Sequence, residues 1–200
     1  MITNFNTFNP TFKAHFLNKT FVEKKNANGQ YKPLKVSVAE IDYNNEDDFE
    51  VLRTNSENWK KEHDKNEYGY FYADRIYNIA KREREDLLRY GATNVHIYVM
   101  TTQNSNFDKL EPEQVLAESD VIDEDWVEDC FIEYMQVRPK YKFNGVKEDR
   151  DIQHIGKVFF NNIVNDIVEK EGVLCPDKIS RGFYNGQKYE EDENGFYHIT

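Results

Sequence analysis

The sequence predicts an α/β or α+β domain built on a mixed sheet, and three observations support this. Strand-like runs and amphipathic helical runs follow one another along the 200 residues. Asn28-Gly29, between two alternating runs, is typical of a β-hairpin. A hydrophobic run at 130–137 is followed by a polar loop and a helical pattern from Ile155. The length is sufficient for one domain with a sizeable core.

The first third of the chain predicts a polar arm and then the hairpin. Residues 1–11 are polar and rich in Asn, which favours a loosely packed arm. Two strands, Lys13–Lys25 and Tyr31–Asp42, are joined by the turn at 26–29. Val36 and Val38 share a parity and are expected to face inward.

Two helices are predicted next. Asn44 and Asn45 can cap a helix start, and the acids after them lie near the positive end of its dipole. Apolar residues then recur at helical spacing as far as Trp59, and the charged run at 60–67 is expected to end this helix. Residues 68–70 are interpreted as a linker, and a second helix, Tyr72–Tyr90, is expected to stop at Gly91.

The second half predicts three strands, a helix and two short closing strands. The strands are Val95–Thr101, Gln114–Asp120 and Cys130–Val137, with an acidic loop at 120–129. The third is almost continuously apolar, which suits a strand buried on both faces, and Pro139 should end its pairing. The helix is expected to stop at Gly172, and a strand at 173–175, a short helix and a last strand at 195–199 follow.

Composition limits the classes of function. The formal charge of −11 argues against nucleic-acid binding, because phosphates would be repelled; it favours a cationic substrate, or else it is a solvated acidic surface. Cys130 and Cys175 are interpreted as buried reduced thiols, and no zinc-type spacing predicts a metal. No secretory signal or membrane-spanning run is seen, so a cytoplasmic protein is expected.

Gly156, at the predicted start of the helix, points to anion binding. The first N–H groups of a helix have no partner within the helix, and with the helix dipole they attract phosphate. A glycine there allows a ligand to approach the backbone closely. The alternative is a glycine that only relieves crowding.

The same stretch resembles the central motif of the GNAT superfamily of N-acetyltransferases. In that family a strand ending in a V-x-P-like tripeptide leads to an (R/Q)-x-x-G-x-(G/A) loop and an amphipathic helix. Val137-Arg138-Pro139 corresponds to the tripeptide, and the segment 153–157 with its helix corresponds to the loop. His154 stands where the motif's first glycine usually is, and the loop after Pro139 is longer than the family's tight turn.

A second resemblance lies downstream. The family pattern N-x-x-A-x-x-(L/F)-Y corresponds to the segment from Asp177 to Tyr184, and a closing strand follows it. The resemblance covers roughly 34–200, which leaves 1–33 as an arm and the first strand of the hairpin. It implies a mostly antiparallel central sheet flanked by helices, with two central strands splayed apart to admit acetyl-CoA.

The resemblance implies direct acetyl transfer from acetyl-CoA, as co-substrate, to a primary amine. Glu133 is the expected base and Tyr184 the expected acid. Strand parity is expected to place Glu133, Met135 and Val137 on one face. A backbone N–H near Met135, Gln136 or Val137 would bind the thioester oxygen. The diphosphate would bind at the helix start, through Arg150, Gln153, His154, Ile155, Gly156, Lys157 and Val158.

Two other interpretations stay open. One is a non-catalytic module on the same fold that binds acyl-CoA or another protein, and the other is an unrelated α/β domain. The expected partner is a small-molecule or peptide amine, and the acidic charge of the chain favours a cationic one. Binding to nucleic acid or to a membrane is not expected. The acceptor's identity and the oligomeric state, a homodimer included, are left open.

Overall fold

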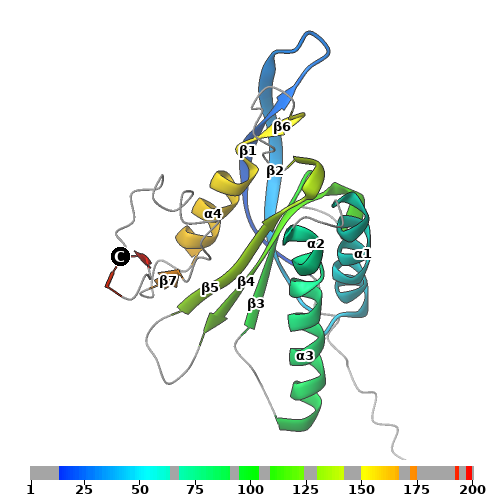
Figure 1. The fold of residues 1–200 in the computed structure, drawn as a ribbon, viewed down its shortest axis with the longest axis vertical. Coiled ribbons are helices and arrows are strands. Elements are labelled where there is room, and N and C mark those ends of the chain that lie inside the picture. Colours follow the sequence, from blue (N-terminus) through cyan, green and yellow to red (C-terminus); the bar gives the residue numbers. More distant parts are fainter. Residues whose placement is uncertain are drawn as a thin grey trace, which may run out of the picture.

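The structure is a computed structural model (Figure 1), and it describes residues 14–63, 68–90, 95–103, 109–123, 130–141, 150–166, 172–174, 192–193 and 197–199. The strands are β1 (His15–Lys25), β2 (Tyr31–Ile41), β3 (Val95–Thr101), β4 (Val115–Asp123), β5 (Cys130–Val137), β6 (Ile152–Gln153), β7 (Gly172–Leu174) and β8 (Tyr197–Ile199). The helices are α1 (Glu46–Glu62), α2 (Tyr68–Tyr72), α3 (Arg75–Tyr90) and α4 (Ile155–Asp166), with 3₁₀ turns η1 (Pro112–Gln114) and η2 (Pro139–Tyr141).

These strands form one mixed sheet in the order β6-β1-β2-β3-β4-β5-β7-β8. Neighbouring strands are antiparallel except β5 and β7, which are parallel. The predicted mixed sheet flanked by helices is therefore confirmed. The predicted hairpin of β1 and β2 is confirmed as well, with Gly29 at φ +78 in its turn. This hairpin extends beyond the other strands, and β6 pairs with it (Figure 1).

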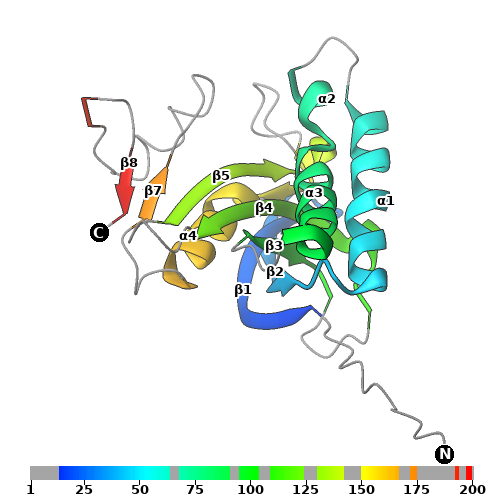
Figure 2. The same cartoon turned by 90° about the horizontal axis from the view of Figure 1, so that it is seen from below.

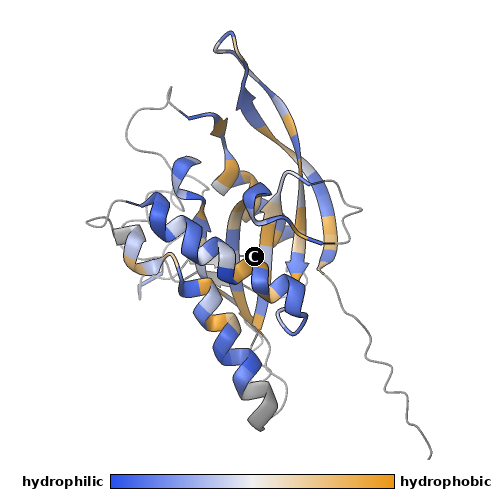
Figure 3. Ribbon diagram, turned by 90° about the vertical axis from the view of Figure 1, so that its right-hand side faces the viewer, coloured by the Kyte–Doolittle hydropathy of each residue, from blue (hydrophilic) through white to orange (hydrophobic). Residues whose placement is uncertain are grey.

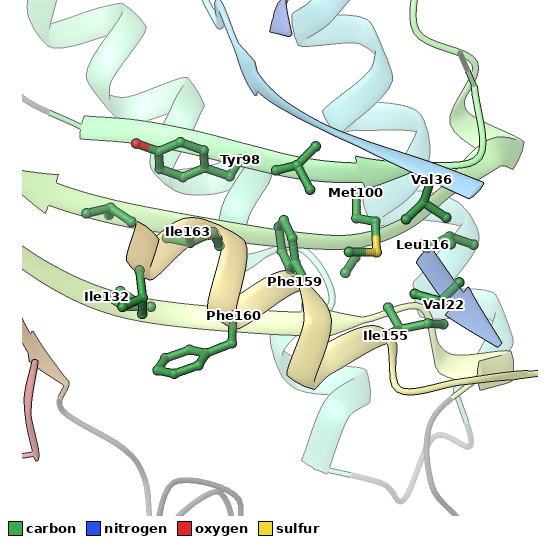
Figure 4. Close-up of a cluster of buried hydrophobic side chains, with 14 of the residues drawn as sticks. Val22, Val36, Tyr98, Met100, Leu116, Ile132, Ile155, Phe159, Phe160 and Ile163 are labelled. Carbon is green, nitrogen blue, oxygen red and sulfur yellow. The ribbon is translucent and has the colours of Figure 1, made fainter. Parts of the chain in front are cut away.

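The helices lie on both faces of the sheet, with α1, α2 and α3 on one face and α4 on the other (Figure 2). The core is correspondingly divided. The cluster on the first face includes Trp59 and Ile76, and the cluster on the second includes Phe159 and Ile163. Figure 4 shows Phe159 between α4 and the strands. This burial is what the apolar stripe of α4 predicts.

The predicted start of α1 is confirmed in detail. The side chain of Asn45 accepts hydrogen bonds from the N–H groups of Asp47 and Asp48, and three acids occupy the first turn. The ribbon colours of Figure 3 show that most residues along α1 and α3 are hydrophilic. Among the helices that the structure describes, none combines the length and apolarity needed to cross a membrane.

Several boundary predictions were wrong. The second helix was predicted to start at Tyr72, but α3 starts at Arg75 and Tyr72 ends α2. Residues 68–70 begin the short helix α2 and are not a linker. β4 continues to Asp123, three residues into the predicted acidic loop, because its pairing with β5 extends that far. The predicted polar loop contains β6, since it meets the projecting hairpin. Gly172 begins β7, and the predicted end of α4 just before it lies outside the described residues.

Several predictions concern residues outside the described ranges. They are the arm at 1–11, Cys175, the second motif at 177–184 with its short helix, and the expected acid Tyr184. The predicted last strand is described at Tyr197–Ile199, where it pairs with β7.

Arg138 ties the end of β5 to the end of α1. Its guanidinium lies 2.6 and 2.9 Å from the Glu62 carboxylate and donates to the Glu113 carbonyl at 2.7 Å. Its own N–H donates to the carbonyl of Leu116 in β4. The Val137-Arg138-Pro139 segment is therefore fixed by the side chain of its central residue.

Candidate functional site

A β-bulge lies at Glu133, in the middle of β5. Tyr134 pairs with Asp120 and Ile132 with Val121, so Glu133 has no partner residue on β4. A bulge bends the strand and redirects side chains, and bulges are frequent beside active sites. The expected base is therefore at a point where the ladder changes direction.

The bulge overturns the predicted parity of β5. Met135 and Val137 pack against the cluster beneath α4, as strand alternation requires. Glu133 faces the other way, and its carboxylate lies 2.8 Å from the guanidinium of Arg75 at the start of α3. The extra residue shifts the alternation by one position, which sequence parity cannot anticipate.

Two buried carboxyl groups of β4 lie on the same side as Glu133. Glu118 and Asp120 alternate along the strand, and only 2% and 0% of their surfaces are exposed. Glu118 accepts hydrogen bonds from Asn55 Nδ2 at 2.6 Å and from Gln136 Nε2 at 3.3 Å. Burial raises the pKa of Glu118 to about 7 despite these bonds.

Asp120 lies beside Glu133. Burial first, and then the negative charge of Glu133, raise the pKa of Asp120 to about 7, although Arg75 opposes the increase. Within the described part of the chain, neither oxygen of Asp120 receives a hydrogen bond. A proton on either carboxyl would let one group donate to the other. Asp120 can therefore take up or release a proton near neutral pH, which is what general acid–base chemistry needs.

Replacing Glu118 with glutamine is expected to change how stability depends on pH. Between its ordinary pKa of 4.5 and the folded value of about 7, the folded chain binds more protons than the unfolded chain. The free energy of unfolding therefore falls as pH rises through this range. Glutamine does not titrate, so the Glu118→Gln variant should not show this fall. The free energy of unfolding of the variant should therefore rise relative to that of wild type by roughly 3 kcal/mol between pH 4 and pH 8.

Urea unfolding across this pH range measures the effect. Glu57→Gln, which changes an exposed acid on α1, is the matched control and should give little shift. A stability difference between wild type and Glu118→Gln that stays constant from pH 4 to pH 8 would contradict the raised pKa.

The backbone at the start of α4 has a conformation that would let a ligand approach it closely. His154 adopts φ +65, in the left-handed region that glycine favours, and Gly156 follows in the first turn. The side chains of Ile155 and Val158 turn toward the core, while Lys157 is exposed. Since α4 begins at Ile155, the N–H groups of Ile155, Gly156 and Lys157 have no carbonyl within the helix to bond. The N–H of Val158 donates to the His154 carbonyl at 3.0 Å, so the prediction that it binds the diphosphate was wrong.

The loop leading into α4 is anchored on the hairpin. Gln153 pairs with Glu23 of β1, and the Tyr31 hydroxyl donates to the Arg150 carbonyl at 2.7 Å. The ring of His154 lies 3.3 Å from the Glu23 carboxylate. The start of α4 is thus positioned by β1 and β2 and not by a tight turn after β5.

The predicted cofactor residues are brought together in part. Met135 and Val137 of β5 contact the same hydrophobic cluster as Ile155 and Val158 of α4, whereas Gln136 points to the opposite face, at Glu118. Two cavities are found elsewhere. One of about 550 Å³ adjoins α1 and α2, and one of about 280 Å³ adjoins the ends of β2 and β3; neither is lined by a predicted site residue.

Sequence reasoning missed Asp120, Glu118, Arg75 and Asn55 as members of this site. Acids at alternate positions of a strand with apolar residues on both sides of them were the available signal for the first two. In the part of the chain that is described, no three His, Cys, Asp or Glu side chains gather as metal ligands would.

Comparison with protein-family models, with curated proteins and with solved structures finds no match to this chain.

Proposed function

We propose that the chain is an acetyl-CoA-dependent N-acetyltransferase that moves an acetyl group directly to a primary amine. The arrangement of β5 is the observation that supports this most. β5 is bulged at Glu133, runs parallel to β7, and pairs with it only over Cys130–Ile132 within the described residues. The far half of β5 therefore has no described strand pairing on that side.

The N–H groups of Met135 and Val137 suit the binding of a thioester oxygen. The Arg138 N–H donates to the Leu116 carbonyl on β4, and successive residues of an antiparallel strand point their N–H groups to opposite sides. The N–H groups of Met135 and Val137 consequently point away from β4. A carbonyl oxygen that gains negative charge there would meet a preoriented donor.

The first turn of α4 suits the diphosphate of acetyl-CoA. Its unpaired N–H groups and dipole attract phosphate, and the left-handed His154 stands where the resembled motif has a glycine. Lys157 is exposed beside this turn and can add a cation. A diphosphate held at α4 and a thioester held at β5 would fix the acetyl carbon for attack.

Glu133 and Asp120 can handle the protons. An amine arrives as its ammonium ion and gives one proton to the carboxyl pair. The neutral amine then attacks the thioester carbonyl carbon, the C–N bond forms, and the C–S bond breaks. The second proton of the amine leaves with the thiolate, so the products are an amide, a free thiol and one proton.

Binding of acyl-CoA without transfer is the second candidate function. The contact of Glu133 with the Arg75 guanidinium at 2.8 Å favours it, because a carboxylate held in this way is not free to take a proton from the amine. Release of free thiol from acetyl-CoA over a panel of primary amines separates the two candidates. Amine-dependent thiol release supports the enzyme, whereas acetyl-CoA binding with no release for any amine supports the binding module.

A further inference from the structure

Arg75 occupies an unusual position for a cation. It is the first residue of α3, whose first turn contains no acid, and a positive charge there opposes the helix dipole. The guanidinium is held instead by Glu133 at 2.8 Å and lies 5.2 Å from the centroid of the Tyr134 ring. Its contacts to the sheet, and not the preference of its own helix, therefore hold it there.

Arg75 leaves a buried carboxyl group beside it without a hydrogen-bond partner among the described residues. Glu133 contacts the guanidinium at 2.8 Å and Asp120 lies beside Glu133, but the fully buried Asp120 carboxyl has no hydrogen-bond donor among the residues described. The Nε atom of Arg75 is also buried without a partner in those residues. Arg75 thus fills the position of a cation without satisfying the polar groups around it.

The same position can be reached from solvent. The Arg75 and Glu133 side chains are 33% and 38% exposed, while Asp120 closes the inner end. A second ring, Tyr72, lies 6.2 Å from Tyr134 between centroids. Carboxylates at one end and aromatic faces beside them are the features that bind organic cations.

We propose that Glu133, Asp120, Tyr134 and Tyr72 form a binding site for an alkyl cation, and that Arg75 occupies this site until the ligand displaces it. The inference rests on the proposed function, because the ligand is then the acceptor: an alkylamine that enters as its ammonium ion. Neutral aromatic amines and acidic peptides lack the charge that this site selects.

Chemical rescue of Arg75→Ala tests the site without acetyl-CoA. Ethylguanidinium at millimolar concentration is expected to fill the vacated position and to raise the melting temperature of the variant by about 3 °C or more. The double variant Arg75→Ala with Glu133→Gln should lose this rescue. Ethylammonium should act in the same way but more weakly, because an ammonium lacks the planar fork of N–H groups with which a guanidinium binds carboxylates.

Arg84→Ala is the matched control. Arg84 lies on the same helix, contacts an aromatic ring (Phe49) and pairs with Glu46, but Glu46 is exposed. Ethylguanidinium should not raise the melting temperature of this variant. Equal rescue of Arg75→Ala and Arg84→Ala, or rescue that survives Glu133→Gln, would overturn the proposed site.

Turnover separates this inference from the proposed function. With acetyl-CoA, Arg75→Ala should show a KM for alkylamines roughly tenfold below that of wild type, because the internal competitor is gone. A KM that is unchanged or raised, with thiol release intact, overturns the inference and leaves the function. Rescue by ethylguanidinium with no thiol release for any amine supports the cation site and overturns the function.

Discussion

Glu133→Gln is expected to lower kcat/KM for the amine by about 10²- to 10⁴-fold, which is the usual contribution of a positioned general base. The glutamine side chain keeps the size of glutamate but cannot take a proton. Asp120 remains, but it is fully buried and is not positioned at the surface where the amine arrives. Thiol release at saturating acetyl-CoA, with the amine concentration varied, measures the effect.

This substitution should leave the fold nearly unchanged. The Glu133–Arg75 pair is more than a third exposed on the Glu133 side, so its loss should cost about 0–1 kcal/mol. Glu57→Gln, at an exposed acid of α1, is the control for a general change in charge. Activity of Glu133→Gln within threefold of this control would remove Glu133 as the base.

Arg138→Ala is expected to lower the free energy of unfolding by about 3 kcal/mol or more, toward the range for breaking a buried ion pair. The Arg138 and Glu62 side chains are only 9% and 23% exposed, so Glu62 would keep a poorly hydrated charge with only the Lys140 N–H, at 3.4 Å, as a described partner. The carbonyl of Glu113 would also lose its donor. Urea denaturation measures the change.

Arg53→Ala, at an exposed ion pair of α1, provides the comparison. Arg53 pairs with Glu50 and Glu57, but all three side chains are more than 40% exposed. Its loss should cost about 0.5 kcal/mol. If Arg138→Ala and Arg53→Ala destabilise the chain equally, Arg138 does not join β5 to α1 in the way described.

The local elements of this fold are readable in the sequence because their signals are local. The aromatic run of β5 predicts its limits, Cys130 and Val137, and the four-residue repeat of α4 predicts its start at Ile155. The Asn-Gly turn likewise predicts the hairpin. Each of these patterns is decided by neighbours in the chain.

The site is less readable because it depends on contacts between distant residues. The bulge at Glu133 arises from the register of β5 on β4, which no local pattern of β5 encodes. Arg75 reaches Glu133 across 58 positions of the chain, so nothing beside either residue predicts the pair. Glu133 was predicted to be important, but its direction and its partners were not.

Titration of acetyl-CoA against wild type and Gly156→Glu, by calorimetry, tests the central claim most directly. The added carboxylate occupies the first turn of α4, where an acid suits the helix dipole, so the variant should fold. It should repel the diphosphate. Gln30→Glu adds the same charge at an exposed position in the hairpin turn and serves as the control.

We expect wild type and Gln30→Glu to bind acetyl-CoA and Gly156→Glu not to bind it. Equal affinity of all three proteins, or no binding by wild type at millimolar acetyl-CoA, would contradict a nucleotide site at the start of α4.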